Sequence, residues 1–147
     1  CLQGLPPIIY GDGQQTRCFS FIQDVLNCLM TACLEIEPLG NVINIGPDEE
    51  VITINELASK ICEITGFKGK PKFLPARPQE VKHAVCSSDK ARKILDYGTK
   101  VNLDDGLQSM VAYIKKRGIS KFNRHIPVEI ISDLTPQTWI SDRMNQI

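Results

Sequence analysis

The 147-residue sequence lacks a surplus of charge of either sign, because 17 lysines and arginines balance 17 aspartates and glutamates. Such a balance gives no indication of binding to nucleic acid or to an anionic membrane. The sequence also contains no apolar run near the length of about 18 residues that a membrane-spanning helix requires. Since 42% of the residues are hydrophobic and 23% are charged, we expect a globular domain.

Cysteine occurs six times but never as a Cys-x-x-Cys pair, and the sequence has only two histidines. Zinc sites usually need such pairs or clustered histidines, so no metal site is predicted. Cys28, Cys33 and Cys62 fall in apolar helical stripes, where a free thiol acts as a small hydrophobic group. The pattern favours a reducing, cytoplasmic setting over a disulfide framework.

Apolar residues recur at helical spacing in four segments, at about 22–34, 54–65, 88–95 and 102–117. A capping box at Thr53 and Glu56 predicts the start of the second helix, and Gly66 is placed to end it. In the first helix we expect one apolar stripe to face the core, formed by Ile22, Val25, Leu26, Leu29, Met30 and Cys33.

Short strands are expected between these helices, at 7–10, 18–21, 41–46, 72–74 and 126–131. Alternating short strands and helices predict a small mixed α/β fold. Residues 118–147 have weak periodicity and two prolines, so we expect a lobe at 1–117 followed by a tail. That tail is predicted to pack on the body or on a partner.

Two separated arginines lie in segments rich in turn-forming residues. Arg17 ends the segment YGDGQQTR at 10–17, and Arg77 begins the segment RPQEV at 77–81. Two planar guanidinium groups suit a diphosphate, because each can bind two phosphate oxygens with charge-assisted hydrogen bonds of about 1.5–3 kcal/mol. The residues alone fit a second interpretation equally well, in which both are surface arginines paired with Asp12 or Glu80.

An ordered set of segments covers about residues 8–116, namely 9–17, 21–25, 42–46, 77–81, 89–95 and 103–107. In this order and spacing they resemble the C-terminal part of the extended short-chain dehydrogenase/reductase family, the NAD-dependent nucleotide-sugar epimerases, dehydratases and decarboxylases. The resemblance implies the substrate-binding lobe of a Rossmann-type enzyme that acts by transient oxidation of the sugar, with UDP as the expected nucleotide. Because the first residue is Cys1, we expect a fragment.

The resemblance implies a substrate-binding role for five residues: Arg17, Arg77, Glu80, Phe19 and Gln15. The two arginines match residues that contact the diphosphate, and Glu80 matches a carboxylate that accepts from the ribose hydroxyls. Phe19 matches a side chain that lines the nucleotide pocket, and Gln15 lies where its loop can reach the bound nucleotide sugar.

Two other positions bear on the local structure. Asp24 matches an aspartate near the start of a helix, for which we expect a structural role. Gln79 stands where the family usually has glycine, so its loop cannot rely on the free positive φ that glycine allows.

The residues for redox chemistry are missing from this sequence. The loop 11–16 lacks the third glycine of a dinucleotide-binding fingerprint, so we interpret it as a substrate loop. The family's base is a tyrosine whose pKa is lowered by a lysine four residues later, but Tyr10, Tyr97 and Tyr113 have no such lysine. No catalytic residue is predicted here, and the chain alone is expected to be inactive.

The resemblance implies that NAD binds to an N-terminal Rossmann half that this sequence lacks. That half is an expected partner, and a homodimer of the full-length enzyme is a further possibility. An alternative function is a non-catalytic nucleotide-sugar-binding or interaction module without a Rossmann half.

Overall fold

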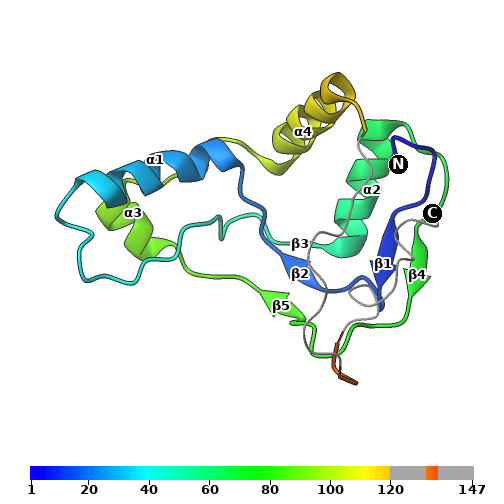
Figure 1. Ribbon diagram of the computed structural model, residues 1–147, viewed down its shortest axis with the longest axis horizontal. Coiled ribbons are helices and arrows are strands. Elements are labelled where there is room, and N and C mark those ends of the chain that lie inside the picture. Colours follow the sequence, from blue (N-terminus) through cyan, green and yellow to red (C-terminus); the bar gives the residue numbers. More distant parts are fainter. Residues whose placement is uncertain (120–131, 136–147) are drawn as a thin grey trace.

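The computed structural model describes residues 1–119 and 132–135, which form a mixed α/β lobe (Figure 1). The strands are β1 (Ile8–Tyr10), β2 (Thr16–Arg17), β3 (Ile52–Thr53), β4 (Lys72–Leu74) and β5 (His83–Ala84). The helices are α1 (Ile22–Leu34), α2 (Ile54–Thr65), α3 (Asp89–Leu95) and α4 (Leu103–Arg117). The strand predicted at 126–131 lies outside the described residues.

The strands form two small sheets. In the first, β1 pairs in parallel with β4, and Tyr10 lies opposite Leu74. In the second, β2 lies between β3, which is antiparallel to it, and β5, which is parallel to it. Because the two strands of each parallel pair run in the same direction, the segments that follow them leave their sheet at the same edge.

Local signals in the sequence set the helix ends, and those of α2 are as predicted. The Thr53 hydroxyl accepts from the Glu56 N–H at 3.1 Å, and the Glu56 carboxylate accepts from the Thr53 N–H at 2.7 Å. Gly66 ends α2 with a φ of 72°. Asn102 caps α4 by accepting from the Asp105 N–H at 2.9 Å. Each bond satisfies a backbone group that a helix end leaves without an internal partner.

Two apolar clusters hold the helices in pairs. At one end of the elongated lobe α1 packs on α3, and at the other end α2 packs on α4 (Figure 1). The buried residues of the first cluster are Cys28, Ala91, Leu95 and Tyr97. Those of the second are Ile52, Leu103 and Leu107. Full burial of one large apolar side chain contributes about 1.5–3 kcal/mol to stability, so burial in these clusters stabilises both helix pairs.

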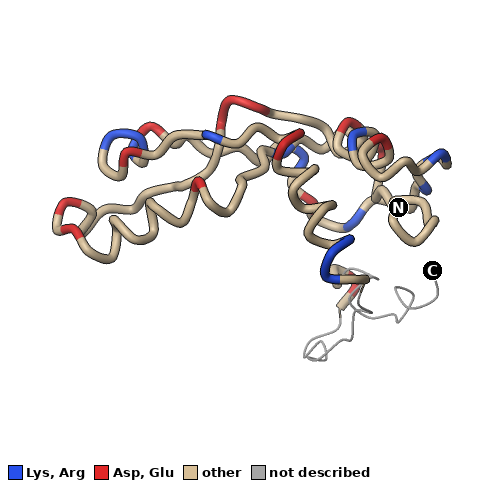
Figure 2. Tube along the Cα trace, turned by 90° about the horizontal axis from the view of Figure 1, so that it is seen from above, with Lys and Arg blue, Asp and Glu red and all other residues tan. Residues whose placement is uncertain are grey.

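The apolar stripe of α1 does not face the core, and the prediction that it would was wrong. Large side chains of that stripe are exposed, among them Ile22, Leu26, Leu29 and Met30. Ile22 is 60% and Met30 is 61% exposed, whereas α1 buries Asp24 and Cys28 instead. Asp24 is also the only charged residue of α1, so the outward side of this helix is uncharged (Figure 2). The residues that the structure describes leave this apolar face uncovered.

Two predicted strands are wrong. Residues 41–46 and 18–21 form no strand in the described part of the chain, and β2 ends at Arg17. A strand requires a neighbour for its backbone hydrogen bonds, and the segment 41–46 has none among the described strands. Its alternate residues Ile43 and Ile45 instead pack against the cluster of α1 and α3. These two side chains are partly buried, but the segment lacks the backbone pairing that a strand requires.

No helix within the ranges 1–119 and 132–135 is long and apolar enough to cross a membrane. Acidic and basic residues are interspersed along the trace, as Figure 2 shows. All six cysteines are free thiols. Cys28 is buried as predicted, Cys62 is half-buried, and Cys33 is exposed together with the stripe of α1.

Candidate functional site

The loop between β1 and β2 is held by the start of α2. The Asn55 side chain donates to the Asp12 carbonyl at 2.9 Å, and the Asn55 N–H donates to the Gly13 carbonyl at 3.0 Å. Gly13 has a φ of 71°, and a Cβ at this position would overlap the Asn55 amide. The loop therefore needs glycine both for its backbone conformation and for space.

This loop leads into strand β2, and α1 begins only at Ile22. A dinucleotide-binding fingerprint instead passes directly into a helix, whose N-terminal N–H groups bind the pyrophosphate. Residues 11–16 therefore lack the strand-to-helix geometry that binds a dinucleotide such as NAD, and their interpretation as a substrate loop stays a prediction.

Arg17 is anchored to the backbone of two strands. Its Nη1 donates to the Thr16 carbonyl at 2.7 Å and to the Lys82 carbonyl at 3.4 Å. Its Nη2 lies 3.8 Å from Oε1 of Glu80, and these two side chains are only 25% and 24% exposed. Nη1 is thus engaged by the backbone and Nη2 faces the Glu80 carboxylate, which is the pairing of Arg17 with Glu80 that the residues alone also allowed.

Gln15 connects the first loop to Glu80. Its side chain is 9% exposed, and its Nε2 donates to the Tyr10 carbonyl at 2.6 Å and to Oε2 of Glu80 at 3.3 Å. Its Oε1 is buried and has no hydrogen-bond partner among the described residues. The Glu80 carboxylate is thus held between an amide and a guanidinium group.

Arg77 lies in the loop that follows β4, on the other side of Tyr10. Its guanidinium carbon is 4.0 Å from the centre of the Tyr10 ring, which is a cation–π contact. In the same loop Gln79 has a φ of 56°, although it is not glycine. The loop thus adopts the left-handed conformation that glycine would favour, and it does so with a residue for which this conformation is unfavourable.

Four of the five predicted residues therefore belong to one continuous chain of contacts, which we call the arginine network: Arg77, Tyr10, Gln15, Glu80 and Arg17. Tyr10 joins the other members but was not predicted as a site residue. Its only signals in the sequence are its aromatic ring and its place just before the loop. The pairing of β1 with β4, which brings it to Arg77, is not visible in the sequence.

Phe19 lies apart from the arginine network. It is exposed and lines an apolar pocket of about 610 Å³ together with Phe21, Leu57, Leu107, Met110 and Tyr113. Its contribution to a nucleotide pocket stays a prediction.

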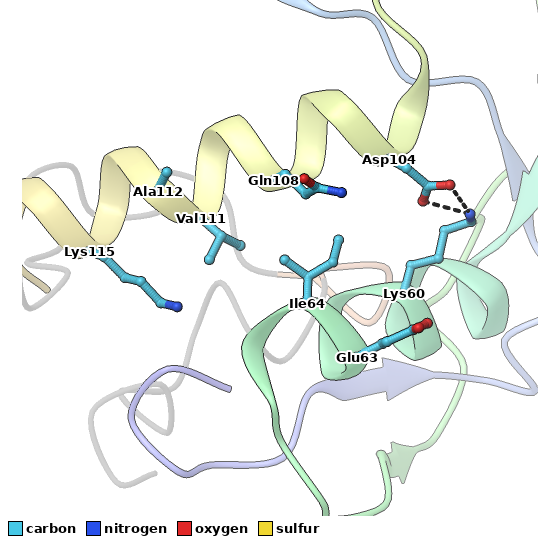
Figure 3. A pocket seen from close by; sticks show the side chains of 8 residues that line it. All are labelled: Lys60, Glu63, Ile64, Asp104, Gln108, Val111, Ala112 and Lys115. Atoms are coloured by element: carbon cyan, nitrogen blue, oxygen red, sulfur yellow. Dashed lines mark hydrogen bonds and ion pairs between the residues drawn. The ribbon is translucent and has the colours of Figure 1, made fainter.

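A second groove, of about 630 Å³, lies between α2 and α4 (Figure 3). Lys60 and Asp104 point toward each other across it, and the Lys60 amine lies 2.7 Å and 2.9 Å from the two Asp104 oxygens. This pair raises the pKa of Lys60. Glu63 and Lys115 also line the groove, so acidic and basic groups balance and the groove offers no excess charge for an anion.

The Cys18 thiol follows Arg17 directly. Burial, and then the nearby Asp48 carboxylate, raise its pKa above the ordinary value. Since the thiolate is the reactive form, this shift keeps Cys18 in its less reactive state at neutral pH. Among residues 1–119 and 132–135, no group of three or more His, Cys, Asp or Glu side chains could hold a metal ion.

Comparison with known proteins gives the context of this site. The family model described as GDP-mannose 4,6 dehydratase matches residues 1–110. UDP-glucuronate 4-epimerase of Thermodesulfobacterium geofontis is 30% identical over 112 residues, which are 76% of this chain and 34% of that protein. A UDP-N-acetyl-alpha-D-glucosaminuronate decarboxylase of Bacillus cytotoxicus is 27% identical over 78% of this chain and 37% of its own length.

Solved structures agree with these relatives. UDP-glucuronic acid 4-epimerase of Bacillus cereus, in complex with UDP-glucuronic acid and NAD, has a TM-score of 0.73 and 35% identity, over 80% of this chain and 37% of its own. UDP-glucose 4-epimerase of Thermotoga maritima with UDP-glucose has a TM-score of 0.73 and 31% identity, over 79% and 37%. The chain thus spans about a third of the length of these proteins, in their C-terminal part, and the predicted fold class is confirmed.

Proposed function

Since this chain belongs to the GDP-mannose 4,6 dehydratase family, we propose that it binds a nucleotide sugar, with UDP as the nucleotide. Its relatives are UDP-sugar epimerases and decarboxylases of the extended short-chain dehydrogenase/reductase family, which is the family that the motifs predicted. In this proposal the chain is the substrate-binding portion of an NAD-dependent epimerase or dehydratase that oxidises the sugar transiently.

The observation that carries the proposal is the arginine network. It brings two guanidinium groups from segments far apart in the sequence into one set of contacts. A diphosphate carries negative charge on both phosphates, so it suits Nη2 of Arg17 and the stacked guanidinium of Arg77. Glu80 accepts hydrogen bonds, which phosphate oxygens cannot donate, so it suits the ribose hydroxyls.

The residues of this chain bind and orient the substrate. The loop 11–16 does not fit a dinucleotide, so we assign NAD and the catalytic base to the part of the relatives that this chain does not span. By itself the chain is then inactive. Holding the diphosphate fixes where the sugar lies, which is a contribution to catalysis through positioning.

The uncovered face of α1 supports a partner of this kind. An uncharged helix side with Ile22 and Met30 mostly exposed is typical of a surface that packs against more protein. We assign the Rossmann-type portion of the enzyme to this face, whether it lies in the same polypeptide or in another. The free thiols support a cytoplasmic setting.

Calorimetric titration of this chain with UDP, UMP and uridine tests the proposal. UDP should bind more tightly than UMP, because the second phosphate adds charge-assisted contacts. Arg17→Ala and Arg77→Ala should each weaken UDP binding by about tenfold to a hundredfold, since such hydrogen bonds contribute about 1.5–3 kcal/mol. Neither change should affect the weaker binding of uridine, which has no phosphate.

Arg117→Ala is a matched control, because Arg117 is an exposed arginine at the end of α4. It changes the net charge equally and should leave UDP binding unchanged. UDP binding that survives both Arg17→Ala and Arg77→Ala would refute the site. Binding of UDP by a chain whose intact reading frame encodes an unrelated neighbouring domain would instead favour the non-catalytic module.

A further inference from the structure

We infer that Tyr10 is a positioning residue of this site: its ring fixes the Arg77 guanidinium, and its carbonyl fixes Gln15. The inference rests on the proposed function and goes beyond it, because it assigns a role to a residue outside the predicted set. Tyr10 acts through its neighbours and need not touch the substrate itself.

Strand pairing places the Tyr10 ring beside Arg77. Tyr10 is the last residue of β1 and lies opposite Leu74, the last residue of the parallel strand β4. The Gly11 N–H donates to the Leu74 carbonyl at 2.9 Å and continues the pairing by one residue. Both loops therefore leave the sheet together, and Arg77 follows Leu74 closely enough for its guanidinium carbon to lie 4.0 Å from the ring centre.

The stacking matters because Arg77 is otherwise an exposed side chain. A long arginine side chain loses up to about 2 kcal/mol of conformational entropy when it is held in one rotamer. A guanidinium that already lies against a ring has lost part of this freedom before the ligand arrives. Because the ring covers a face of the guanidinium, the N–H groups at the edge of its plane stay accessible to phosphate oxygens.

The Tyr10 backbone fixes the other half of the network. Its carbonyl accepts from Nε2 of Gln15 at 2.6 Å, and the same nitrogen donates to Glu80 at 3.3 Å. The two loops also lie close together, because a Cβ added to Gly11 would lie only 3.4 Å from the Cβ of Ala76. A shift of Tyr10 would therefore move Arg77 on one side of the network and Gln15 with Glu80 on the other.

The ring of Tyr10, rather than its hydroxyl, makes the contact with Arg77, because the guanidinium lies over the face of the ring. Tyr10 is followed four residues later by Gln14, so no lysine is placed in the sequence to make its hydroxyl a base. Phenylalanine should then replace it, and leucine should not. This contrast separates stacking from any role of the hydroxyl.

UDP titration of the full 147-residue chain with Tyr10→Leu, Tyr10→Phe and Arg77→Ala tests the inference. Tyr10→Leu should raise the Kd for UDP about two- to fivefold, as expected for loss of an exposed cation–π contact, while Tyr10→Phe stays near the unaltered value. In the Arg77→Ala background, Tyr10→Leu should have little further effect, because the two residues act together. Phe73→Leu, which removes an exposed ring from the same sheet, should not change UDP binding.

Proton NMR gives a second readout that does not require UDP. The Cδ protons of Arg77 should be shifted upfield by the ring current in the unaltered chain and in Tyr10→Phe, and this shift should vanish in Tyr10→Leu. An unshifted Arg77 in the unaltered chain would overturn the inference. A merely structural role of Tyr10 would lower stability without producing this coupled pattern.

The outcomes separate the inference from the proposed function. If the unaltered chain does not bind UDP, the proposed function fails and the role of Tyr10 fails with it. If UDP binding depends on Arg77 but Tyr10→Leu leaves the Kd unchanged, only the inference is overturned. The same holds if Tyr10→Leu weakens binding equally with and without Arg77.

Discussion

Arg92 of α3 binds the Asp48 carboxylate with both of its terminal nitrogens, and Nη1 lies 3.2 Å from Oδ2. Asp48 also accepts from the Ser88 N–H at 2.9 Å, so one carboxylate joins the segment before β3 to the start of α3. The hydrogen bond from Arg92, followed by that from Ser88, lowers the pKa of Asp48 to about 2. The same guanidinium also lowers the pKa of Glu49.

Acid should therefore weaken the fold through Asp48. Because its pKa is lower in the folded chain than the ordinary value of about 3.9, the stabilisation is complete above about pH 5 and is lost as the pH falls toward 2. Urea unfolding followed by circular dichroism between pH 7 and pH 3 measures this loss. Asp48→Asn should be less stable at pH 7 and should show a smaller change between these pH values. Glu37→Gln, which alters an exposed carboxylate, should keep the pH dependence of the unaltered chain, and a pH dependence reduced as much as in Asp48→Asn would contradict the assignment.

Gly13→Ala should destabilise the chain and distort the loop at 11–16. The left-handed backbone alone disfavours alanine by about 1–2 kcal/mol, and overlap with the Asn55 amide adds to this. Gly40→Ala is the control, because Gly40 has a φ of 72° but nothing within 4 Å of the added Cβ. Urea unfolding should show a clearly larger loss for Gly13→Ala. Equal losses would mean that the Asn55 contact does not hold the loop.

Gln79→Gly should stabilise the chain by about 0.5–1 kcal/mol. Glycine relieves the left-handed strain, which exceeds the entropy that its more flexible unfolded chain adds. Gln14→Gly is the comparison, since Gln14 is not among the residues with positive φ and should lose stability when replaced. Urea unfolding of both variants and of the unaltered chain measures these differences in the free energy of unfolding. Destabilisation by Gln79→Gly would show that the loop does not need positive φ there.

Lysine on the uncovered face of α1 should leave the fold intact. Leu26→Lys and Met30→Lys place charge where both side chains are already exposed, so the circular dichroism spectrum should not change. Self-association at high concentration, measured by sedimentation velocity, should decrease because the apolar face is interrupted. Leu95→Lys provides the contrast, since Leu95 is buried and its replacement should unfold the chain. Unfolding by Met30→Lys would show that the face is covered.

The helix ends were predictable because their signals are local. Thr53 and Glu56 bond to each other's backbone within a single turn, and Gly66 follows at the place where the helix must end. The structural role expected for Asp24 is also found, although its partners are distant: its carboxylate accepts from the N–H groups of Lys100 and Val101, both at 3.1 Å.

Features that depend on distant neighbours were not predictable. The apolar pattern of α1 identifies a helix, but what covers each side decides which side is buried, and Cys28 rather than Met30 faces α3. The arginines were identified by their chemistry and by the family resemblance. Their link through Tyr10 depends on β1 pairing with β4, and the sequence gives no register for that pairing.

The parallel alignment of β1 and β4 has a consequence for how such a chain can diverge. The sheet of β1 and β4 places Tyr10 beside Arg77, and Arg17 lies in β2 of the other sheet, so the arginine network contains no residue of the exposed stretch at 39–42. Residues inserted there should lengthen this stretch without altering the arginine network. A chain of this fold can thus vary in shape at 39–42 while keeping the same arginine network.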